Sequence, residues 1–482
     1  MTARRSLTVR TLFEALVTGH PPPFRGLDRP ISQVTIDSRE ATPDSLFVAL
    51  KGEHEDGHTF IRDALERGAS AVIAEPMAQQ LGLPAATFIS GEPPETEQAE
   101  PPYIFIVPDS LAGFQEVAAY WRRQLPHIRV VGVTGSVGKT SVKEQVTSVL
   151  KQRFHTLKSA GNYNNEIGLP WSLLQLTPEH ERAVLEMGMY AIGEIRHLAN
   201  LALPHTGVVT NIGPTHLERL GSLEAITDAK AELVEALPPQ GTAILNGDDP
   251  RVRSLAERTE AQVFTYGLSP TCDLWADQIE SRGIEGLRFQ FHTASEDIFA
   301  VVPLLGQHSV HTALAAASVG LIEGEGWDEI IGGLKDISAQ VRLVTVPGIH
   351  GSIILDDTYN ASPASTLAAL NLLADLPGRR IAVLGDMYEL GSYEQAGHEL
   401  VGTRTADVAD LLVTVGKLGR LIGEAALAAG MKDQQVQAFA TKQEAIHLLR
   451  TLLQERDILL VKGSRGLQME EIVAALSSSV SS

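Results

Sequence analysis

The chain has 482 residues, 44% of them hydrophobic, and a formal net charge of −20. A single hydrophobic core rarely grows this large, so we expect two to four domains, and the acidic balance argues against a nucleic-acid partner, which needs clustered Lys and Arg. The one cysteine, Cys272, excludes an internal disulfide and fits a reducing compartment. We find no secretory leader and no apolar run near the ~18 residues of a membrane span, so we expect a cytoplasmic protein without membrane insertion.

The first third of the sequence predicts a small α/β unit. Apolar periodicity and turn residues predict strands at 34–39, 46–50, 71–74 and 104–107, and helices at 8–16, at 60–67 and through Trp121. A Pro-rich turn is predicted at residues 21–23, and the acidic, proline-rich residues 91–102 are typical of a loop or spacer. We therefore expect a first domain of residues 1–127.

A glycine-punctuated turn follows the next predicted strand, at residues 130–134, and leads into a predicted helix that begins near Val142. Strand, tight loop and helix form the context that a phosphate-binding loop requires. Backbone N–H groups and a helix N-terminus would cradle phosphate oxygens, Lys139 adds a positive charge, and Thr140 offers a hydroxyl to Mg²⁺. The segment therefore predicts an ATP site with Mg²⁺, built from Thr134, Gly135, Ser136, Gly138, Lys139, Thr140 and Ser141.

The rest of the chain alternates strands and helices in the doubly wound manner. In the central part, residues 128–341, the predicted strands 183–188, 206–212 and 241–246 end in polar residues. Ligands gather at the carboxyl ends of parallel strands, so Glu186, Asn211 and Asn246 are well placed to bind one. The last part, residues 342–482, predicts strands at 352–356, 380–384, 411–415 and 458–461 and a helix at 366–373, without a phosphate loop of its own.

Several polar residues allow two interpretations. His216 is either a metal ligand or a satisfied structural histidine, and Lys230, on a predicted helix, looks at first like a solvated surface charge. The asparagines at positions 162, 164 and 165 lie between glycines. They form either a simple turn or a loop that binds a ligand. Asp356 and Asp357 follow a strand and precede a helix capped by Ser362 or Ser365; they form either a capped turn or contacts to ribose or metal.

Taken together, these stretches resemble the Mur ligases, which build the stem peptide of peptidoglycan. The resemblance covers nearly the whole chain. Its marks are Asp37-Ser38-Arg39, Asp56-Gly57-His58, Gly138-Lys139-Thr140, Asn162 to Asn165, Glu186-Met187-Gly188, Asn211-Ile212-Gly213 with His216, Asp356 to Pro363, Gly385-Asp386-Met387 with Glu389-Leu390-Gly391, and Lys462-Gly463-Ser464-Arg465. The Tyr-Asn-Ala-x-Pro and Gly-Asp-Met-x-Glu-Leu-Gly stretches point to the dipeptide-adding branch.

The resemblance implies a three-domain α/β fold: a UDP-sugar domain, a central ATP domain, and a Rossmann-like C-terminal domain that binds the incoming amine. It implies a cytoplasmic monomer that joins UDP-N-acetylmuramoyl-tripeptide to D-alanyl-D-alanine through an acyl phosphate. The residues to which it gives roles fall into four sets. The catalytic set is Lys139, His216, Lys230 and Arg342, and the metal set is Thr140, Glu186, His216 and a carbamoylated Lys230. The ATP-binding set consists of the phosphate loop with Asn246, Arg342 and Asp357. The substrate-binding set is Ser38, Arg39, Asn162, Asn165, Asn360 and Lys462.

Three stretches depart from the family pattern. Pro43-Asp44-Ser45 replaces the usual Pro-Gly-Asp, Glu186-Met187-Gly188-Met189-Tyr190 replaces Glu-Leu-Gly-Ala-Asn, and Ser309 and Thr312 replace two amides expected near ATP. Two alternative functions stay open. One is another amide ligase of this superfamily, either the diamino-acid-adding type, whose Asp-Asn-Pro-Arg stretch is absent here, or a folyl-polyglutamate or cyanophycin type. The other is a nucleotide-binding regulatory protein without activity, which the intact phosphate loop argues against.

Overall fold

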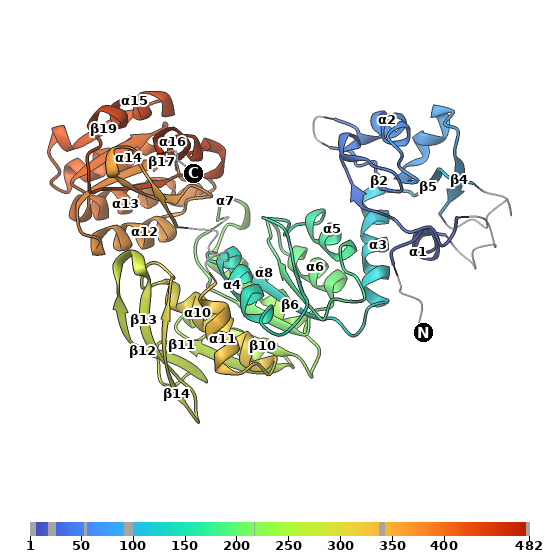
Figure 1. The fold of residues 1–482 in the computed structure, drawn as a ribbon, viewed down its shortest axis with the longest axis horizontal. Coiled ribbons are helices and arrows are strands. Elements are labelled where there is room, and N and C mark those ends of the chain that lie inside the picture. Colours follow the sequence, from blue (N-terminus) through green and yellow to red (C-terminus); the bar gives the residue numbers. More distant parts are fainter. Residues whose placement is uncertain are drawn as a thin grey trace. The chain divides into compact units, whose positions relative to one another are not determined.

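The computed structural model describes residues 6–17, 26–52, 55–90, 100–215, 217–336 and 343–478. These residues form three sheets of five, nine and six strands, flanked by helices, so the predicted three-domain α/β fold is confirmed (Figure 1). Two compact units are distinguished along the chain. The first contains residues 1–132, 154–187 and 196–205, and the second contains residues 133–153, 188–195 and 206–482. No described helix is long and apolar enough to cross a bilayer.

The five-stranded sheet has the order β1-β2-β3-β5-β4, and its strands are parallel. The strands are β1 (Val34–Thr35), β2 (Leu46–Val48), β3 (Ala71–Ala74), β4 (Ala86–Ile89) and β5 (Tyr103–Ile106), and the helices are α1 (Val9–Leu16), α2 (Ile61–Glu66) and α3 (Ser110–Arg123). The sequence did not predict β4. The strand predicted at 34–39 ends early because Asp37 accepts a hydrogen bond from Arg39 N and starts a 3₁₀ turn. The Pro-rich turn at 21–23 and residues 91–99 lie outside the described part of the chain.

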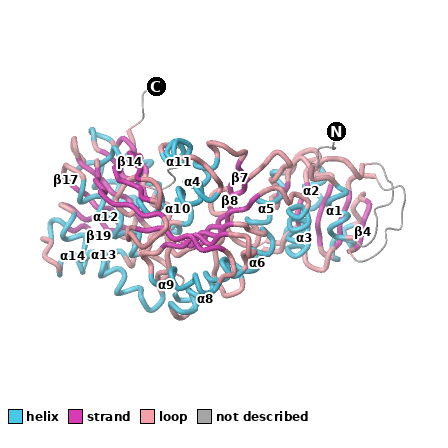
Figure 2. Tube along the Cα trace, turned by 90° about the horizontal axis from the view of Figure 1, so that it is seen from below, coloured by secondary structure: helices cyan, strands magenta, loops and turns pink. Residues whose placement is uncertain are grey.

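The nine-stranded sheet has the order β14-β13-β12-β11-β10-β9-β6-β8-β7. Its strands are β6 (Arg129–Thr134), β7 (Thr156–Lys158), β8 (Arg182–Glu186), β9 (Thr206–Val209), β10 (Thr242–Asn246), β11 (Gln262–Gly267), β12 (Leu274–Ser281), β13 (Leu287–His292) and β14 (Asp297–Val302). Its helices are α4 (Lys139–Leu150), α5 (Gly168–Leu174), α6 (Glu194–Ala202), α7 (Leu217–Leu220), α8 (Leu223–Glu235), α9 (Pro250–Ser254), α10 (Ser309–Ile322) and α11 (Trp327–Leu334). Figure 2 shows α4, α10 and α11 on one face of these strands and α8 and α9 on the other.

The doubly wound prediction omitted the far end of this sheet. Strands β12, β13 and β14 pair antiparallel and extend the parallel part beyond β11. Residues 287–292 alternate between buried and half-buried side chains before two buried residues end the strand, as expected for a sheet covered on one face. Trp327 of α11 packs on Phe291, with ring centroids 5.2 Å apart, and so helps to cover that face.

The six-stranded sheet has the order β15-β16-β20-β17-β18-β19, with β15 antiparallel and the other strands parallel. The strands are β15 (Val344–Pro347), β16 (Ile353–Asp357), β17 (Arg379–Gly385), β18 (Leu411–Val415), β19 (Val436–Phe439) and β20 (Asp457–Lys462), and the helices are α12 (Pro363–Asp375), α13 (Glu394–Val408), α14 (Gly419–Ala428), α15 (Lys442–Leu452) and α16 (Glu470–Leu476). Because β20 lies between β16 and β17, the carboxyl ends of these three strands meet where the strand order switches, which is where open α/β sheets bind ligands.

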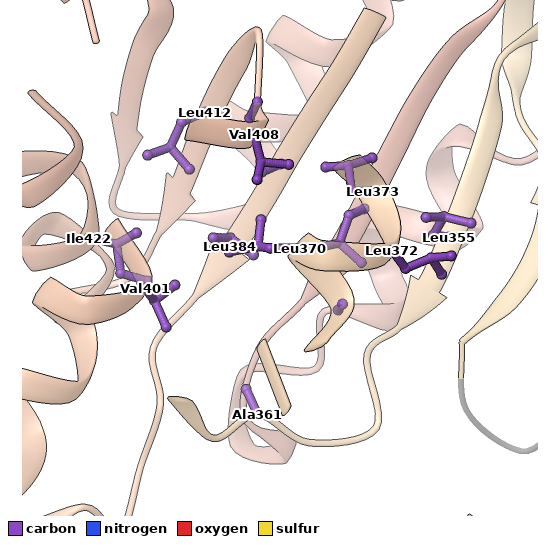
Figure 3. Close-up of a cluster of buried hydrophobic side chains, with 14 of the residues drawn as sticks. Leu355, Ala361, Leu370, Leu372, Leu373, Leu384, Val401, Val408, Leu412 and Ile422 are labelled. Carbon is purple, nitrogen blue, oxygen red and sulfur yellow. The ribbon is translucent and has the colours of Figure 1, made fainter. Parts of the chain in front are cut away.

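Two apolar layers hold the six-stranded sheet. On one face, α12, α13 and α14 pack side chains such as Leu370, Val401 and Ile422 against Leu384 and Leu412 of the sheet (Figure 3). On the other face, α15 and α16 pack against Ile381 and Val413. The predicted cap at the start of α12 is confirmed, since Ser362 Oγ accepts a hydrogen bond from Ser365 N. These rigid layers fix the loops at the carboxyl edge of the sheet.

Candidate active site

The phosphate loop between β6 and α4 has the geometry that the sequence predicts. Gly138 starts α4 with a left-handed backbone (φ 84°), which favours glycine. A Cβ on Gly135 would lie 1.9 Å from Thr210 Oγ1, so only glycine fits that position. Lys139 folds back over the loop and donates to the Gly135 carbonyl at 2.8 Å, and Thr140 is buried in the first turn of the helix. The loop therefore presents backbone N–H groups and a hydroxyl at a helix N-terminus, which suits a phosphate group.

Asn211, just beyond β9, braces this loop. Its side-chain Oδ1 accepts from Val137 N at 2.9 Å, and its Nδ2 donates to the Val137 carbonyl at 2.8 Å. Thr210 Oγ1 donates to the same carbonyl at 2.7 Å, and Ser136 N donates to the Asn211 carbonyl at 2.9 Å. Asn211 therefore holds the phosphate loop, and the sequence placed it at the correct sheet edge without revealing this bracing role.

Lys230 is buried, so its interpretation as a solvated surface charge is wrong. The side chain on α8 is 1% exposed, and none of the described residues forms a hydrogen bond or ion pair with it. Burial, with the nearby Lys139 charge as a smaller cause, lowers the pKa of Lys230 well below its usual range. This environment favours the neutral amine, which is a nucleophile.

The amide cluster at residues 162–165 divides between the two interpretations. Asn165 Oδ1 accepts from Gly168 N at 2.9 Å and caps the start of α5, which is a structural role. Asn164 Nδ2 donates to Glu186 Oε1 at 2.9 Å and so orients the buried carboxylate at the end of β8. The backbone carbonyl of Asn162 accepts from Asn164 N at 2.7 Å and closes the turn. Only Asn164, which was not among the predicted site residues, contacts one of them.

A cavity of about 540 Å³ lies beside the phosphate loop. Asn246, Tyr266, Ser309 and Thr312 line it together with apolar side chains such as Leu305. The amide of Asn246 donates to the Thr210 carbonyl at 2.9 Å, and Ser309 Oγ donates to the Leu305 carbonyl at 2.6 Å. An apolar cavity of this size with a few polar groups next to a phosphate loop suits a nucleoside.

Asp357 and Lys462 also line this cavity, where they pair with each other. Lys462 Nζ lies 2.5 Å from Asp357 Oδ2 and donates to the Asn360 carbonyl at 2.9 Å, and both charged side chains are buried. The capped-turn interpretation holds for Asp356, whose Oδ1 accepts from Thr358 N at 3.1 Å. Asp357 and Lys462 thus fix each other at the carboxyl ends of β16 and β20.

A second, mainly polar cavity of about 100 Å³ lies between the phosphate loop and the C-terminal segments. Ser136 and Lys139 line it from the loop, and Asn360, Tyr388 and Glu389 line it from the six-stranded sheet. The sequence missed Tyr388 and Glu389 as lining residues, although they fall inside the Gly-Asp-Met-x-Glu-Leu-Gly stretch. A reacting phosphate and a group carried by the C-terminal domain can meet there.

In the five-stranded domain, Arg39 and Asp37 form an exposed pair. Hydrogen bonds from the Arg39 guanidinium lower the pKa of Asp37 to about 2. The hydroxyl of the buried Ser38 lowers the pKa of Asp63 by hydrogen bonding to its carboxylate. The predicted site residues His216 and Arg342 lie outside the described residues.

Comparison with known proteins gives the following relatives. The family models match as the Mur ligase family catalytic domain over residues 30–116, the Mur ligase middle domain over 133–320, and the Mur ligase glutamate ligase domain over 341–465. The UDP-N-acetylmuramoyl-tripeptide–D-alanyl-D-alanine ligases of Escherichia coli and Bacillus subtilis are 37% and 36% identical to the chain. The alignments cover 94% and 92% of the chain and 95% and 93% of those proteins.

Solved structures agree with these sequence matches. A crystal structure of MurF from Acinetobacter baumannii superposes with a TM-score of 0.82 at 30% identity, over 98% of each chain. MurF ligase from Thermotoga maritima in complex with ADP superposes with a TM-score of 0.75 at 28% identity, over 92% of this chain and 96% of that one.

Proposed function

The chain belongs to the Mur ligase family, and on that premise we propose that it is an ATP-dependent ligase that joins D-alanyl-D-alanine to UDP-N-acetylmuramoyl-tripeptide in peptidoglycan precursor synthesis. The observation that carries the proposal is identity of 36–37% to ligases of that name over almost the whole chain, which includes the intact phosphate loop. The domains are residues 1–127 for the UDP-sugar, 128–341 for ATP and 342–482 for the incoming amine. The protein works in the cytoplasm as a monomer.

The chemistry requires activation, because amide formation from a carboxylate is uphill in water. An oxygen of the tripeptide carboxylate attacks the γ-phosphorus of ATP, and ADP leaves. The amine of the dipeptide then attacks the acyl-phosphate carbonyl, loses a proton, and expels phosphate from the tetrahedral intermediate. Lys139 and the loop N–H groups hold the triphosphate, with Arg342 at the γ-phosphate, and the large cavity with Asn246 and Asp357 receives the nucleoside. In addition to the structural contacts of Asn165 and Lys462, we propose that the other substrates are bound by Ser38, Arg39, Asn162, Asn165, Asn360 and Lys462.

Mg²⁺ fits the donor groups that the chain offers. The buried hydroxyl of Thr140 and the buried carboxylate of Glu186 are hard oxygen donors, and we assign them to the metal with His216. No three His, Cys, Asp or Glu side chains of the described residues cluster as a metal cage, which suits an ion held partly by phosphates. When bound, Mg²⁺ would offset the negative charge of the triphosphate.

Lys230 would complete this site as a carbamate. Its buried amine, favoured in the neutral form, would attack CO₂ and release one proton, which turns a neutral group into a carboxylate beside Lys139. In ¹³C-bicarbonate we expect a carbamate ¹³C resonance in the wild-type protein and none in Lys230→Met. Lys151, an exposed lysine that follows α4, gives the matched control Lys151→Met, which should keep the resonance. A wild-type spectrum without the signal would remove the carbamate from the proposal.

The activity itself is tested by the mass of the product. Purified protein, ATP, Mg²⁺ and UDP-N-acetylmuramoyl-tripeptide are incubated with D-alanyl-D-alanine or with single amino acids. We expect a product heavier by the dipeptide less one water, with equimolar phosphate, and none with single amino acids. Lys139→Ala should reduce the rate by at least about a thousandfold, since it removes a positive charge at the reacting phosphate. Product with a single amino acid and none with the dipeptide would assign the chain to another branch of the family.

A further inference from the structure

An exposed guanidinium stands at the carboxyl edge of the six-stranded sheet, directly after β20. The side chain of Arg465 is 67% exposed, and its Cζ lies 5.7 Å from the centre of the Tyr359 ring. Its one ion pair among the described residues is with Glu470, at 3.3 Å between Nη1 and Oε1. This exposed, long contact is weak, and the other N–H groups contact none of the remaining described residues. Arg465 therefore keeps most of its donors for a ligand.

The backbone on both sides of Arg465 is fixed. Ser464 is buried, its N–H donates to the Asp386 carbonyl at 3.0 Å, and its Oγ accepts from Tyr388 N at 2.8 Å. Gly466 packs against the Tyr388 ring, because a Cβ there would lie 3.2 Å from it. Asp386 is in turn anchored by hydrogen bonds from Leu418 N and Gly419 N. An accessible guanidinium on a fixed backbone is the arrangement of a preorganised binding residue.

This anchor stands beside the small polar cavity at the phosphate loop. Tyr388, which touches Gly466, lines that cavity, and so does Asn360, the neighbour of the Tyr359 ring under Arg465. Another cation at this edge, Lys462, already pairs with Asp357 and donates to the Asn360 carbonyl. On a chain with a net charge of −20, an anionic ligand needs such a local positive group.

We propose that Arg465 binds the terminal carboxylate of the incoming dipeptide and so directs the dipeptide's amine toward the small cavity. The planar fork of the guanidinium matches a carboxylate with two parallel hydrogen bonds, and the Tyr359 ring supports its face. The inference rests on the proposed function, since it assigns a subsite to that function's amine substrate. It makes Arg465 a binding residue for one end of the dipeptide, while the phosphate loop acts at the other end.

Steady-state kinetics of Arg465→Ala test the assignment. We expect the KM for D-alanyl-D-alanine to rise by about ten- to a hundredfold, as a lost charged hydrogen-bond pair predicts, with the KM values for ATP and the UDP-tripeptide unchanged. Arg465→Lys keeps the positive charge but loses the planar guanidinium, so its KM for the dipeptide should lie between those of the wild type and Arg465→Ala. Lys417, an exposed cation after β18 of the same sheet, provides the control Lys417→Ala, whose KM for the dipeptide should stay within about twofold of wild type.

The decisive comparison uses D-alanyl-D-alaninamide, which lacks the carboxylate charge. The wild-type protein should bind the amide about ten- to a hundredfold more weakly than the dipeptide, and Arg465→Ala should no longer distinguish the two. The assignment would be overturned if Arg465→Ala still ligates the dipeptide and either distinguishes it from the amide as strongly as wild type does or has the wild-type KM for the dipeptide. Absence of any dipeptide product in the wild type would instead overturn the proposed function. An unchanged midpoint of thermal unfolding would show that Arg465→Ala acts on binding, as expected for an exposed residue.

Discussion

Arg122, near the end of α3, should contribute strongly to the stability of the first compact unit. Its guanidinium is 2% exposed and donates to the carbonyls of Leu125, Ala202 and Ile128 at 2.7, 2.8 and 3.0 Å. These bonds join α3 to the loop that precedes β6 and to the end of α6. We expect Arg122→Met, which fills similar space without donors, to destabilise this unit because it leaves buried carbonyls without partners.

The size of the effect follows from two opposing contributions. Three hydrogen bonds from a charged donor are worth about 1.5–3 kcal/mol each. Burial lowers the pKa of Arg122 to about 10 from 12.5, so relief of the charge's desolvation returns about 3 kcal/mol when the side chain becomes Met. The net loss is then about 2–6 kcal/mol. Arg122 stays protonated at neutral pH, so the difference between the proteins should not change between about pH 6 and 8.

Urea unfolding followed by tryptophan fluorescence measures this loss. Trp121 and Trp171 lie in the same unit as Arg122, and their indole N–H groups donate to the carbonyls of Leu176 and Val34. The neighbouring Arg123 supplies the control, because its exposed ion pair with Glu116 predicts a change within about 0.5 kcal/mol for Arg123→Met. Equal transition midpoints for the two variants would refute the reasoning.

Two further predictions concern charged side chains in the second unit. Burial alone would lower the pKa of His292, but hydrogen bonds to Asp277 and Asp297 outweigh it and raise the pKa. The stabilisation is therefore complete below about pH 6.5 and lost as pH rises through the higher folded pKa, so urea midpoints should fall between pH 6 and 8 in wild type and less in His292→Gln. Asp357→Ala should cost about 3–5 kcal/mol because it strands the buried Lys462 ammonium, and adding Lys462→Met should recover most of the loss; additive losses in urea unfolding would contradict this coupling.

Local signals predicted the parts of the fold that repeat a simple pattern. Buried parallel strands such as β6, β18 and β20 are continuous apolar runs, so their positions followed from sequence. The positions of β12–β14 did not, because strands with one exposed face carry charges such as Arg288 and Asp297 that weaken the apolar signal. Strand β4 was missed because only one of its four residues, Phe88, is fully buried.

For the candidate site, the sequence identified residues in local motifs but not the burial or the long-range contacts of their side chains. The phosphate loop follows from local geometry, since Gly138 and Lys139 take their positions from the turn itself. The burial of Lys230 could not be read from local sequence, because nothing within α8 reveals what packs over it, and burial of a lysine depends on distant chain segments. The same limit hid the contact between Asn164 and Glu186, which joins residues 22 positions apart in the chain.

Hydrogen-bond use separates the structural polar groups of this site from those that a ligand would engage. Side-chain amides hydrogen-bond to backbone groups at Asn165, Asn211 and Asn246, so these amides mainly hold loops in place. Lys230 and Arg465 differ, because one is buried without a partner in the described chain and the other keeps donors beyond one weak ion pair. Neither side chain contributes much to folding stability. The buried amine of Lys230 is instead suited to react with CO₂, and the exposed guanidinium of Arg465 is suited to bind a carboxylate. The assignments of Lys230 and Arg465 therefore rest on the same criterion, a polar group that the described chain leaves largely unused. The carbamate resonance tests the first assignment, and the KM for the dipeptide tests the second.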